Sequence, residues 1–136
     1  MYQACMLHAR ADRALRLVVA QELEQYRVTM MEWLLLGVVV NGPVNGLSMS
    51  AIAHELDVTL PQVTALVTNL IKQKLVKQKT QTHDRRSRHV IPTPKGQDLL
   101  DSIEESIVSA MKEWVADVPR DKLQVYLETV KILATK

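Results

Sequence analysis

The sequence of 136 residues has only one cysteine, Cys5, and only four glycines. A single cysteine excludes a framework of intrachain disulfides. The sequence also lacks an apolar run of the ~20 residues that a membrane-spanning helix needs. Its long apolar stretch, Trp33 to Val40, predicts a buried helix instead. Because the N-terminal residues do not have the layout of a signal peptide, we expect a cytoplasmic protein that makes no contact with a membrane.

Residue patterns that support catalysis or metal binding are also scarce. The sequence has no evident Ser/His/Asp set, no pair of catalytic carboxylates and no glycine-rich phosphate loop. The four histidines, His8, His54, His83 and His89, do not have the spacing of metal ligands on one helical turn. The sequence therefore predicts neither an enzyme nor a metal site, and it predicts no cofactor.

Charge is unevenly distributed along the chain. Residues 1–57 hold four arginines against six acids, a net −2, and residues 97–136 hold five cations against eight acids, a net −3. Residues 58–96 hold eight cations against one acid, a net +7. This basic middle is either an ordinary solvated surface or a site for a polyanion such as nucleic acid.

Apolar periodicity and helix caps predict one mainly α-helical domain with a small β-hairpin. An apolar content of 47% with 24% charged residues fits a single globular domain. Capping boxes at Thr29 to Glu32 and Thr59 to Gln62, and the pair Thr93-Pro94, mark helix starts. The predicted helices cover Tyr2 to about Glu24, Thr29 to Val40, Ser48 to Leu56 and Thr59 to about Lys74. Two more helices are predicted, one of roughly 22 residues from Pro94 and a last one from Pro119. The predicted strands are Val76 to Thr82 and His89 to Thr93.

Residues 52–66 have the apolar spacing of a helix-turn-helix unit, in which two short helices cross around a tight turn. The apolar positions are Ile52, Ala53, Leu56, Val58, Val63 and Leu66. Asp57 stands at the turn, and aspartate tolerates a left-handed backbone better than most residues. Since any two helices joined by a tight turn show part of this pattern, the pattern alone does not distinguish a DNA-binding unit.

The second helix of this unit presents a small, polar face, and no acidic residue occurs from Val58 to Gln81. Solvated faces usually mix Glu with Lys, whereas a lack of carboxylates suits contact with phosphates. Asn and Gln can pair with adenine, Thr and Ala methyl groups can contact thymine, and the free amides of the helix start can hold a phosphate. The predicted DNA contacts are Thr59, Pro61, Gln62, Thr64, Ala65, Thr68, Asn69 and Lys72, although Lys72 also suits the C-terminal end of the helix dipole.

The hairpin that follows is rich in cations. Alternation along the first strand places Lys77 and Lys79 on one face, where they could follow phosphates. At the tip, the lone Asp84 is expected to pair with Arg86 across the turn and to hold it extended. Arg85 and Arg88 are then free for phosphate or for a narrow minor groove.

These features together resemble the MarR family (multiple antibiotic resistance regulators), which are dimeric winged-helix repressors and activators. The resemblance covers nearly the whole chain, and its most specific parts are the capped helix Thr59 to Leu70, the exit Lys74-Leu75-Val76, the wing His83 to Arg88, and Thr93-Pro94-Lys95-Gly96.

The resemblance implies a winged helix-turn-helix lobe at residues 29–96 that binds double-stranded DNA. It implies that the Thr59–Asn69 face reads the major groove, and that Arg86, oriented by Asp84, enters the minor groove. Residues 1–28 and 97–136 would be the dimerisation helices of a homodimer that reads a pseudo-palindromic operator. Ala65 stands where many members carry a polar or basic residue, so base specificity does not transfer.

Two sensing mechanisms are open. Family members commonly respond to a small phenolic or lipophilic effector between the dimer helices and the DNA lobe, where His8, Met30 and Trp33 could line a cleft or could simply fill the core. The segment around Cys5 is similar to the first helix of the peroxide-sensing branch of the family, although the usual tyrosine partner is replaced here. The alternative to a DNA-binding regulator is a winged helix that serves as a protein–protein interaction module for an acidic partner.

Overall fold

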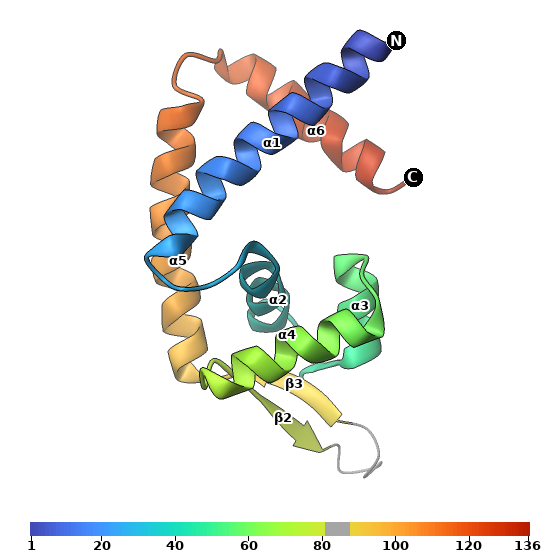
Figure 1. Cartoon of the computed structure of the whole chain (residues 1–136), viewed down its shortest axis with the longest axis vertical. Coiled ribbons are helices and arrows are strands. Elements are labelled where there is room, and N and C mark those ends of the chain that lie inside the picture. Colours follow the sequence, from blue (N-terminus) through green and yellow to red (C-terminus); the bar gives the residue numbers. More distant parts are fainter. Residues whose placement is uncertain (81–87) are drawn as a thin grey trace.

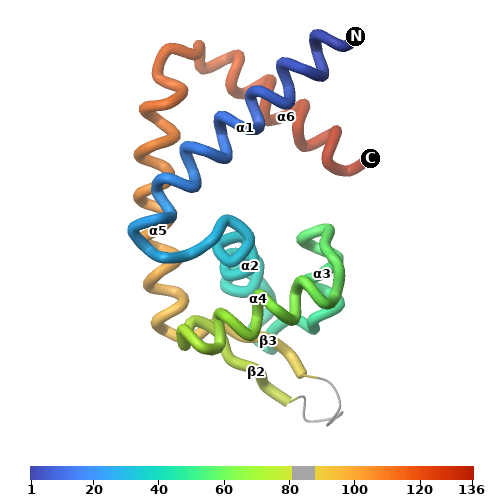
Figure 2. The backbone as a smooth tube through the Cα atoms, in the orientation of Figure 1, coloured from blue at the N-terminus to red at the C-terminus, as the bar shows by residue number. Residues whose placement is uncertain are grey.

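The computed structural model describes residues 1–80 and 88–136. Its elements are α1 (Tyr2–Glu24), α2 (Met30–Val40), β1 (Leu47–Ser48), α3 (Met49–Leu56), α4 (Leu60–Lys72), β2 (Val76–Thr80), β3 (Arg88–Pro92), α5 (Pro94–Trp114) and α6 (Arg120–Ala134). The helices α2 to α4 and the strands form a lobe at one end, and α5 leads from this lobe to α6 at the other end (Figures 1 and 2). The predicted fold class, mainly α with a small hairpin, is confirmed. Among the described residues, no helix is both long and apolar enough to cross a membrane.

The lobe contains one apolar core, to which α2, α3, α4, α5 and the sheet all contribute. Leu35, Ile52, Val63, Leu70 and Val90 are completely buried in it. Full burial of one such side chain stabilises the fold by about 1.5–3 kcal/mol, so this cluster fixes the orientation of α4 relative to α2 and the sheet. The prediction that Trp33 to Val40 belong to a helix packed in the core is confirmed by the buried side chains of Leu35, Leu36 and Val39.

A second, smaller cluster joins α1 to α5 and consists of Val19, Leu23, Val28, Ile103 and Ile107. The partly buried side chains of Trp33 and Leu99 pack against both clusters and so connect the lobe to the long helix. The buried residues of α1 lie in its C-terminal half only.

The sheet has three antiparallel strands in the order β1-β3-β2, and not the two strands that the sequence predicted. The additional strand, β1, pairs Leu47 with Val90 and Ser48 with His89. Two residues are too few to show a period-2 pattern, so only the tertiary contact with β3 reveals this strand. It connects the start of α3 to the base of the hairpin.

Two residues with left-handed backbone end the helices of the helix-turn-helix unit. Asp57 has φ 54° and ψ 49° after α3, as the sequence predicted for this turn. Lys74 has φ 60° after α4, which ends at Lys72, close to the end at about Lys74 that the sequence predicted. In both cases the backbone N–H of the next residue donates a hydrogen bond to the carbonyl five residues earlier. Val58 donates to Ala53 and Leu75 donates to Leu70, both at 3.0 Å. These bonds satisfy carbonyls at the helix ends and turn the chain sharply.

The predicted reciprocal capping box at Thr29 and Glu32 is only half correct. The Thr29 hydroxyl accepts a hydrogen bond from Glu32 N–H at 3.2 Å, as expected. The Glu32 carboxylate, however, accepts from the Thr29 hydroxyl and from Gln73 Nε2, both at 3.1 Å. Glu32 is buried, and a buried carboxylate needs hydrogen-bond donors. The Gln73 amide supplies one from the end of α4, so this contact ties α4 to the start of α2.

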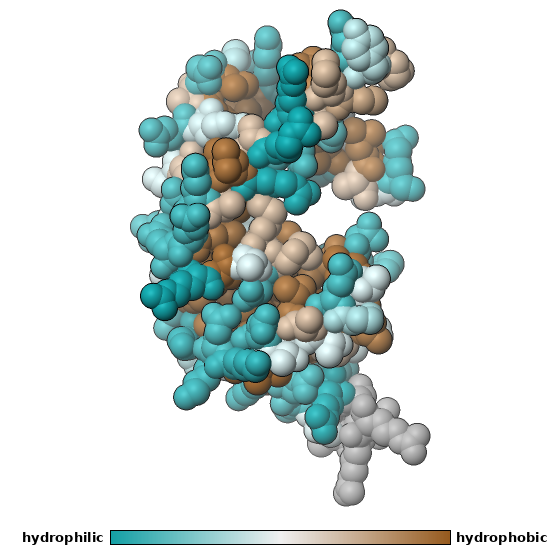
Figure 3. Space-filling model, in the orientation of Figure 1, coloured by the Kyte–Doolittle hydropathy of each residue, from teal (hydrophilic) through white to brown (hydrophobic). Residues whose placement is uncertain are grey.

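The α6 end of the molecule exposes apolar side chains. No residue of α6 is buried, and Tyr126, Leu127 and Leu133 are each more than half exposed. The N-terminal half of α1 exposes Tyr2 and Leu7 in the same way. Figure 3 shows brown, hydrophobic surface at this end of the molecule, around the termini.

Candidate DNA interface

Helix α4 has one face fixed in the core and one face open to solvent. Val63, Val67 and Leu70 are buried on the inner face. All eight residues that the sequence predicted to contact DNA from this helix and its cap are exposed: Thr59, Pro61, Gln62, Thr64, Ala65, Thr68, Asn69 and Lys72. The structure therefore places these predicted contacts on the solvent side of one well-anchored helix.

The start of α4 is held by the capping box that the sequence predicted. Thr59 N–H donates to Gln62 Oε1 at 2.9 Å, and Gln62 N–H donates to the Thr59 hydroxyl at 3.4 Å. The Thr59 hydroxyl also donates to Gln62 Oε1 at 3.0 Å. Because this oxygen already accepts two hydrogen bonds, Gln62 cannot pair bidentately with adenine without giving up the cap. It can still offer its amide N–H groups as donors.

The threonine hydroxyls on the outer face of α4 are also engaged. Thr64 Oγ1 donates to the Leu60 carbonyl at 3.0 Å, and Thr68 Oγ1 donates to the Thr64 carbonyl at 2.8 Å. Each hydroxyl has therefore used its only proton within the helix. These side chains can offer DNA a methyl group and an oxygen that accepts hydrogen bonds, but no donor.

Asn69 and Ala65 complete the centre of this face. No hydrogen bond of the Asn69 side chain is found among the described residues, so its amide can both donate and accept. Asparagine with both groups available is the side chain that pairs bidentately with adenine. Of the amides on this helix, Asn69 therefore fits base recognition better than Gln62.

The C-terminal end of α4 is fixed by a cluster that the sequence did not reveal. Lys95 Nζ donates to the Gln73 carbonyl at 3.0 Å, and the Thr93 hydroxyl donates to the Lys74 carbonyl at 2.7 Å. A Cβ on Gly96 would collide with the Leu75 carbonyl oxygen, so the start of α5 approaches the chain here closely. Thr93 and Gly96 were recognised only as a helix start, because their second role depends on residues about 20 positions earlier.

The register of the hairpin separates its cations onto two faces. Lys79 lies opposite His89, and Lys77 lies opposite Ile91. Arg88 lies opposite Thr80, on the face that also carries the buried Val90. Because alternate residues point to opposite faces, Arg88 is on the core side of the sheet, the side of α4, and the two lysines are on the other side. All three cations are exposed, and Lys77 and Lys79 share one face, as the alternation along the first strand predicted.

The predicted tip of the hairpin lies outside the described residues. Asp84, Arg85 and Arg86 belong to residues 81–87, which the structure does not describe. The pairing of Asp84 with Arg86 and the role of Arg86 stay predictions.

The structure brings together two of the three predicted effector-binding residues. Met30 and Trp33 both line a cavity of about 380 Å³ between α1, α2 and α5. His8 lies on the exposed N-terminal half of α1 and is not among the residues that line this cavity. Cys5 is a free, exposed thiol on the same part of α1, and its redox role stays a prediction. Within the described part of the chain, no three His, Cys, Asp or Glu side chains are grouped so as to hold a metal ion.

Comparison with known proteins identifies a family pattern in the lobe. Residues 28–87 match the model of the MarR family. No curated protein matches the chain significantly in sequence. This match and the winged-helix fold confirm the resemblance to the MarR family that the sequence predicted.

Several solved structures have the same fold over nearly the whole chain. MepR from S. aureus, in its complex with DNA, is 22% identical with a TM-score of 0.82, over 97% of both chains. A transcriptional regulator of the MarR family from Rhodococcus sp. RHA1 is 18% identical with a TM-score of 0.87, over 97% of this chain and 92% of that chain. CouR from Rhodococcus jostii RHA1, bound to p-coumaroyl-CoA, is 20% identical with a TM-score of 0.81, over 94% and 89%. At these identities the likeness shows the fold.

Proposed function

From the MarR family pattern in residues 28–87, we propose that this protein is a transcription regulator that binds operator DNA as a homodimer and acts as a repressor. The observation that carries the proposal is the outer face of α4. It is exposed and free of carboxylates, the Thr59 cap closes its start, and Gln73 and Lys95 tie its end to α2 and α5. A rigid, small-featured helix of this kind can enter the major groove.

The contacts of α4 would be of two kinds. Its first backbone amides and Lys72 would bind phosphates, which fixes the position of the helix without reading sequence. Asn69 would read a base edge, and the methyl groups of Ala65 and Thr68 would contact thymine. MepR, whose fold this chain shares, has been crystallised with DNA, which supports DNA as the partner.

The hairpin would contribute a second group of contacts. Arg88 lies on the same side of the sheet as α4, where it could bind the phosphates beside the major groove. In the proposal Arg86 enters the minor groove with Asp84 beside it, as the family resemblance implies.

The homodimer would form through α1, the distal part of α5 and α6. The apolar side chains that α6 and the N-terminal half of α1 expose would otherwise remain in water. A two-fold dimer presents two α4 helices, and these would read the two halves of a pseudo-palindrome.

A small lipophilic effector is proposed to release the protein from DNA. CouR, which has the same fold, binds p-coumaroyl-CoA, and the cavity lined by Met30 and Trp33 offers apolar space next to the lobe. An effector acts only if it binds the DNA-competent and the incompetent conformation with different affinity.

The test is the selection of bound duplexes from a random pool, followed by titration of the selected sequence at several salt concentrations. We expect one enriched pseudo-palindrome and an affinity that falls steeply with salt through counterion release. Arg86→Ala should weaken operator binding while the dimer and the fold stay intact. If no sequence is enriched and the protein instead binds an acidic protein partner, it is an interaction module and the proposal is wrong.

A further inference from the structure

Glu32, near the start of α2, is the only charged residue that is buried in the described part of the chain. One of its carboxylate oxygens accepts a hydrogen bond from the Thr29 hydroxyl, and the other accepts one from Gln73 Nε2, both at 3.1 Å. No described cation forms an ion pair with it. Because a buried charge without hydrogen-bond donors is costly, this carboxylate needs the Gln73 amide, which comes from the end of a different helix.

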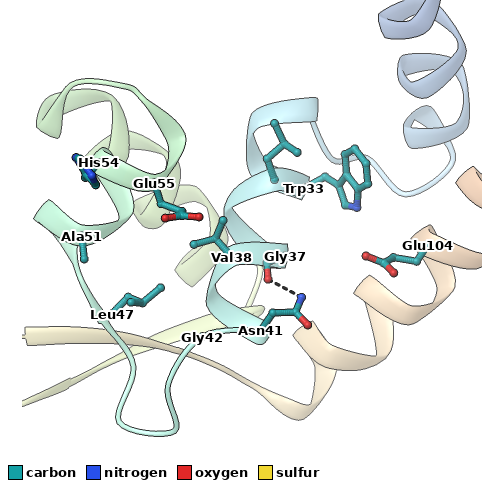
Figure 4. Close-up of a pocket in the computed structure, with 11 residues that line it drawn as sticks. Trp33, Gly37, Val38, Asn41, Gly42, Leu47, Ala51, His54, Glu55 and Glu104 are labelled. Carbon is teal, nitrogen blue, oxygen red and sulfur yellow. Dashed lines mark hydrogen bonds between the residues drawn. The ribbon is translucent and has the colours of Figure 1, made fainter. Parts of the chain in front are cut away.

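The carboxylates on the other side of α2 have no such requirement. Glu55 of α3 and Glu104 of α5 line a cavity beside α2, and both are exposed (Figure 4). Water can solvate them, so they do not restrain the helices that carry them. The hydrogen bonds of Glu32, in contrast, restrain how α2 and the end of α4 lie relative to each other.

Helix α2 is a rigid support for this contact. Four of its eleven residues are buried. Thr29 caps its start, and at its end the Asn41 side-chain amide donates to the Gly37 carbonyl at 2.8 Å (Figure 4). A residue that is bound to Glu32 is therefore bound to a helix whose own position is fixed.

Gln73 connects this support to two other helical segments. Its backbone carbonyl accepts a hydrogen bond from Lys95 Nζ, at the start of α5, at 3.0 Å. Its backbone N–H donates to the Asn69 carbonyl, one turn earlier in α4, at 3.1 Å. The side chain, the carbonyl and the N–H of one residue thus join α2, α5 and the last turn of α4, next to the residue that is proposed to read a base.

The apolar core does not replace these hydrogen bonds. Val63, Val67 and Leu70 hold the inner face of α4 against the core, but hydrophobic contacts have no preferred direction. Hydrogen bonds weaken steeply when their angle or length changes. They therefore restrict the small rotations and shifts of α4 that apolar packing permits, and a bidentate base contact is sensitive to such shifts.

We infer that Gln73 is a positioning residue for operator recognition, although its side chain is bound to the buried Glu32 and not directed at DNA. Its hydrogen bonds to Glu32 and Lys95 hold Asn69 in the orientation in which both amide groups of Asn69 meet a base edge. This role deepens the proposed function, on which it rests, by adding a determinant of sequence specificity that does not touch DNA.

The test compares the affinity of the full-length protein for the selected operator with its affinity for random-sequence duplex. Binding to random DNA depends on phosphate contacts, so the ratio of the two affinities reports how well α4 is placed. Gln73→Glu puts a second carboxylate against Glu32, and like charges repel. We expect the ratio to fall about 5- to 50-fold, most of what one bidentate base contact contributes. A folded Gln73→Glu variant with an unchanged ratio would overturn the inference, because a purely structural contact lowers only the free energy of unfolding.

A reversed pair provides the rescue. In the double variant, Glu32→Gln with Gln73→Glu, the amide comes from α2 and the carboxylate from α4. The hydrogen bond then forms in the opposite direction, and the net charge is that of the wild type. The ratio should return to within about twofold of the wild-type value, as expected for two directly coupled residues. If the double variant folds but discriminates as poorly as Gln73→Glu, the contact between these side chains does not place α4.

Lys74→Gln is the matched control. It changes the net charge by the same amount as Gln73→Glu, at the next residue along the chain, and it leaves the contact with Glu32 intact. It should lower both affinities alike and keep their ratio. An equal fall of the ratio in this variant would mean that charge near DNA, and not the position of α4, causes the effect.

Lys95→Met decides the outcome if Gln73→Glu does not fold. The Lys95 side chain is exposed, so its replacement leaves the core intact while the Gln73 carbonyl loses a donor. The ratio should fall about two- to fivefold, the effect of one hydrogen bond at a partly exposed position. An unchanged ratio would overturn the inference in that case.

The backbone amide resonances of α4, recorded by NMR without DNA, separate this inference from the proposed function. Gln73→Glu should shift them as far along the helix as Thr64, and the double variant should restore them; resonances that do not shift would contradict the positioning role. A protein that selects an operator but keeps its ratio in Gln73→Glu retains the regulator proposal and loses this one. A protein that selects no operator loses the regulator proposal, and the resonances then decide whether Gln73 places α4.

Discussion

The outer faces of α4 and α6 are two exposed helical surfaces of opposite character. On α4 the exposed side chains are mostly small or polar, although Leu60 and Ile71 are also exposed, and hydrogen bonds of Gln73 and Lys95 tie the C-terminal end of the helix to the lobe. On α6 no residue is buried, and large apolar side chains such as Tyr126, Leu127 and Leu133 are exposed beside the charged ones. Water is a satisfactory partner for the first surface and a poor one for the second. The outer face of α4 thus suits a polar partner that binds a rigid helix. The exposed face of α6 suits contact with a second copy of the chain.

Tyr126, Leu127, Val130 and Leu133 form an exposed apolar stripe on α6. The largest expected effect comes from a charge in this stripe. Val130→Lys should separate the dimer and lower operator affinity about 100-fold or more, because a monomer can bind only one half-site and loses the gain from linkage. Analytical ultracentrifugation and operator titration measure the two effects.

Glu128→Lys is the control, since it places the same side chain on the other side of α6. This variant should remain dimeric and should bind the operator at least as well. If Val130→Lys also stays dimeric, the exposed stripe of α6 is not the dimer interface, and the comparison with α4 loses its explanation.

The second effect is on base recognition by α4. Asn69→Ala should lower operator affinity about 10- to 100-fold, because a bidentate pair contributes about 1–3 kcal/mol of discrimination. Affinity for random-sequence DNA should stay unchanged, and a thermal melt should show that the fold is intact. An equal loss on both DNAs would mean that Asn69 does not read a base.

The third effect concerns the anchoring of α4. Gly96→Ala should lower the free energy of unfolding by about 1–3 kcal/mol, because the added methyl group overpacks the contact with the Leu75 carbonyl. Gly37→Ala is the matched control and should instead raise it by about 0.5–1 kcal/mol, the ordinary gain of alanine in a helix. Urea denaturation measures both values. If both variants lose stability equally, the close approach at Gly96 is not special.

The smallest expected effect is on the salt dependence of DNA binding, and it distinguishes the two faces of the hairpin. Arg88→Gln should reduce the slope of log affinity against log salt by about 0.9, the value for one lost phosphate contact. Lys77→Gln removes the same charge from the opposite face of the sheet and should change the slope less. A larger change for Lys77→Gln would mean that DNA approaches the hairpin from the side away from α4.

Local signals made most of the fold predictable. The capping pairs at Thr29, Thr59 and Thr93 place three helix starts correctly, because a cap depends on residues only three positions away. Asp57 also adopts the predicted left-handed turn. The strand Leu47–Ser48 could not be found in this way, because it exists only through its pairing with β3.

The candidate site was predictable to the extent that it lies on a single helix. Exposure of the α4 residues follows from helical periodicity once the buried positions are known. The hydrogen bonds of those residues do not follow from it. Gln62 was expected to be available to adenine, but the capping box occupies its oxygen. Lys95 was noted only as part of the motif that opens the long helix, because its partner, the Gln73 carbonyl, is 22 residues earlier.

The sequence by itself determined which segments are helices and which face of α4 lacks carboxylates, since both depend on spacing within one segment. The tertiary structure alone decided which of these exposed groups are available to a partner. It tied Gln73 to Glu32 and Lys95 to Gln73, placed Arg88 and Lys77 on opposite faces, and left the apolar stripe of α6 uncovered. Each of these outcomes depends on where distant segments meet, and local spacing does not encode that.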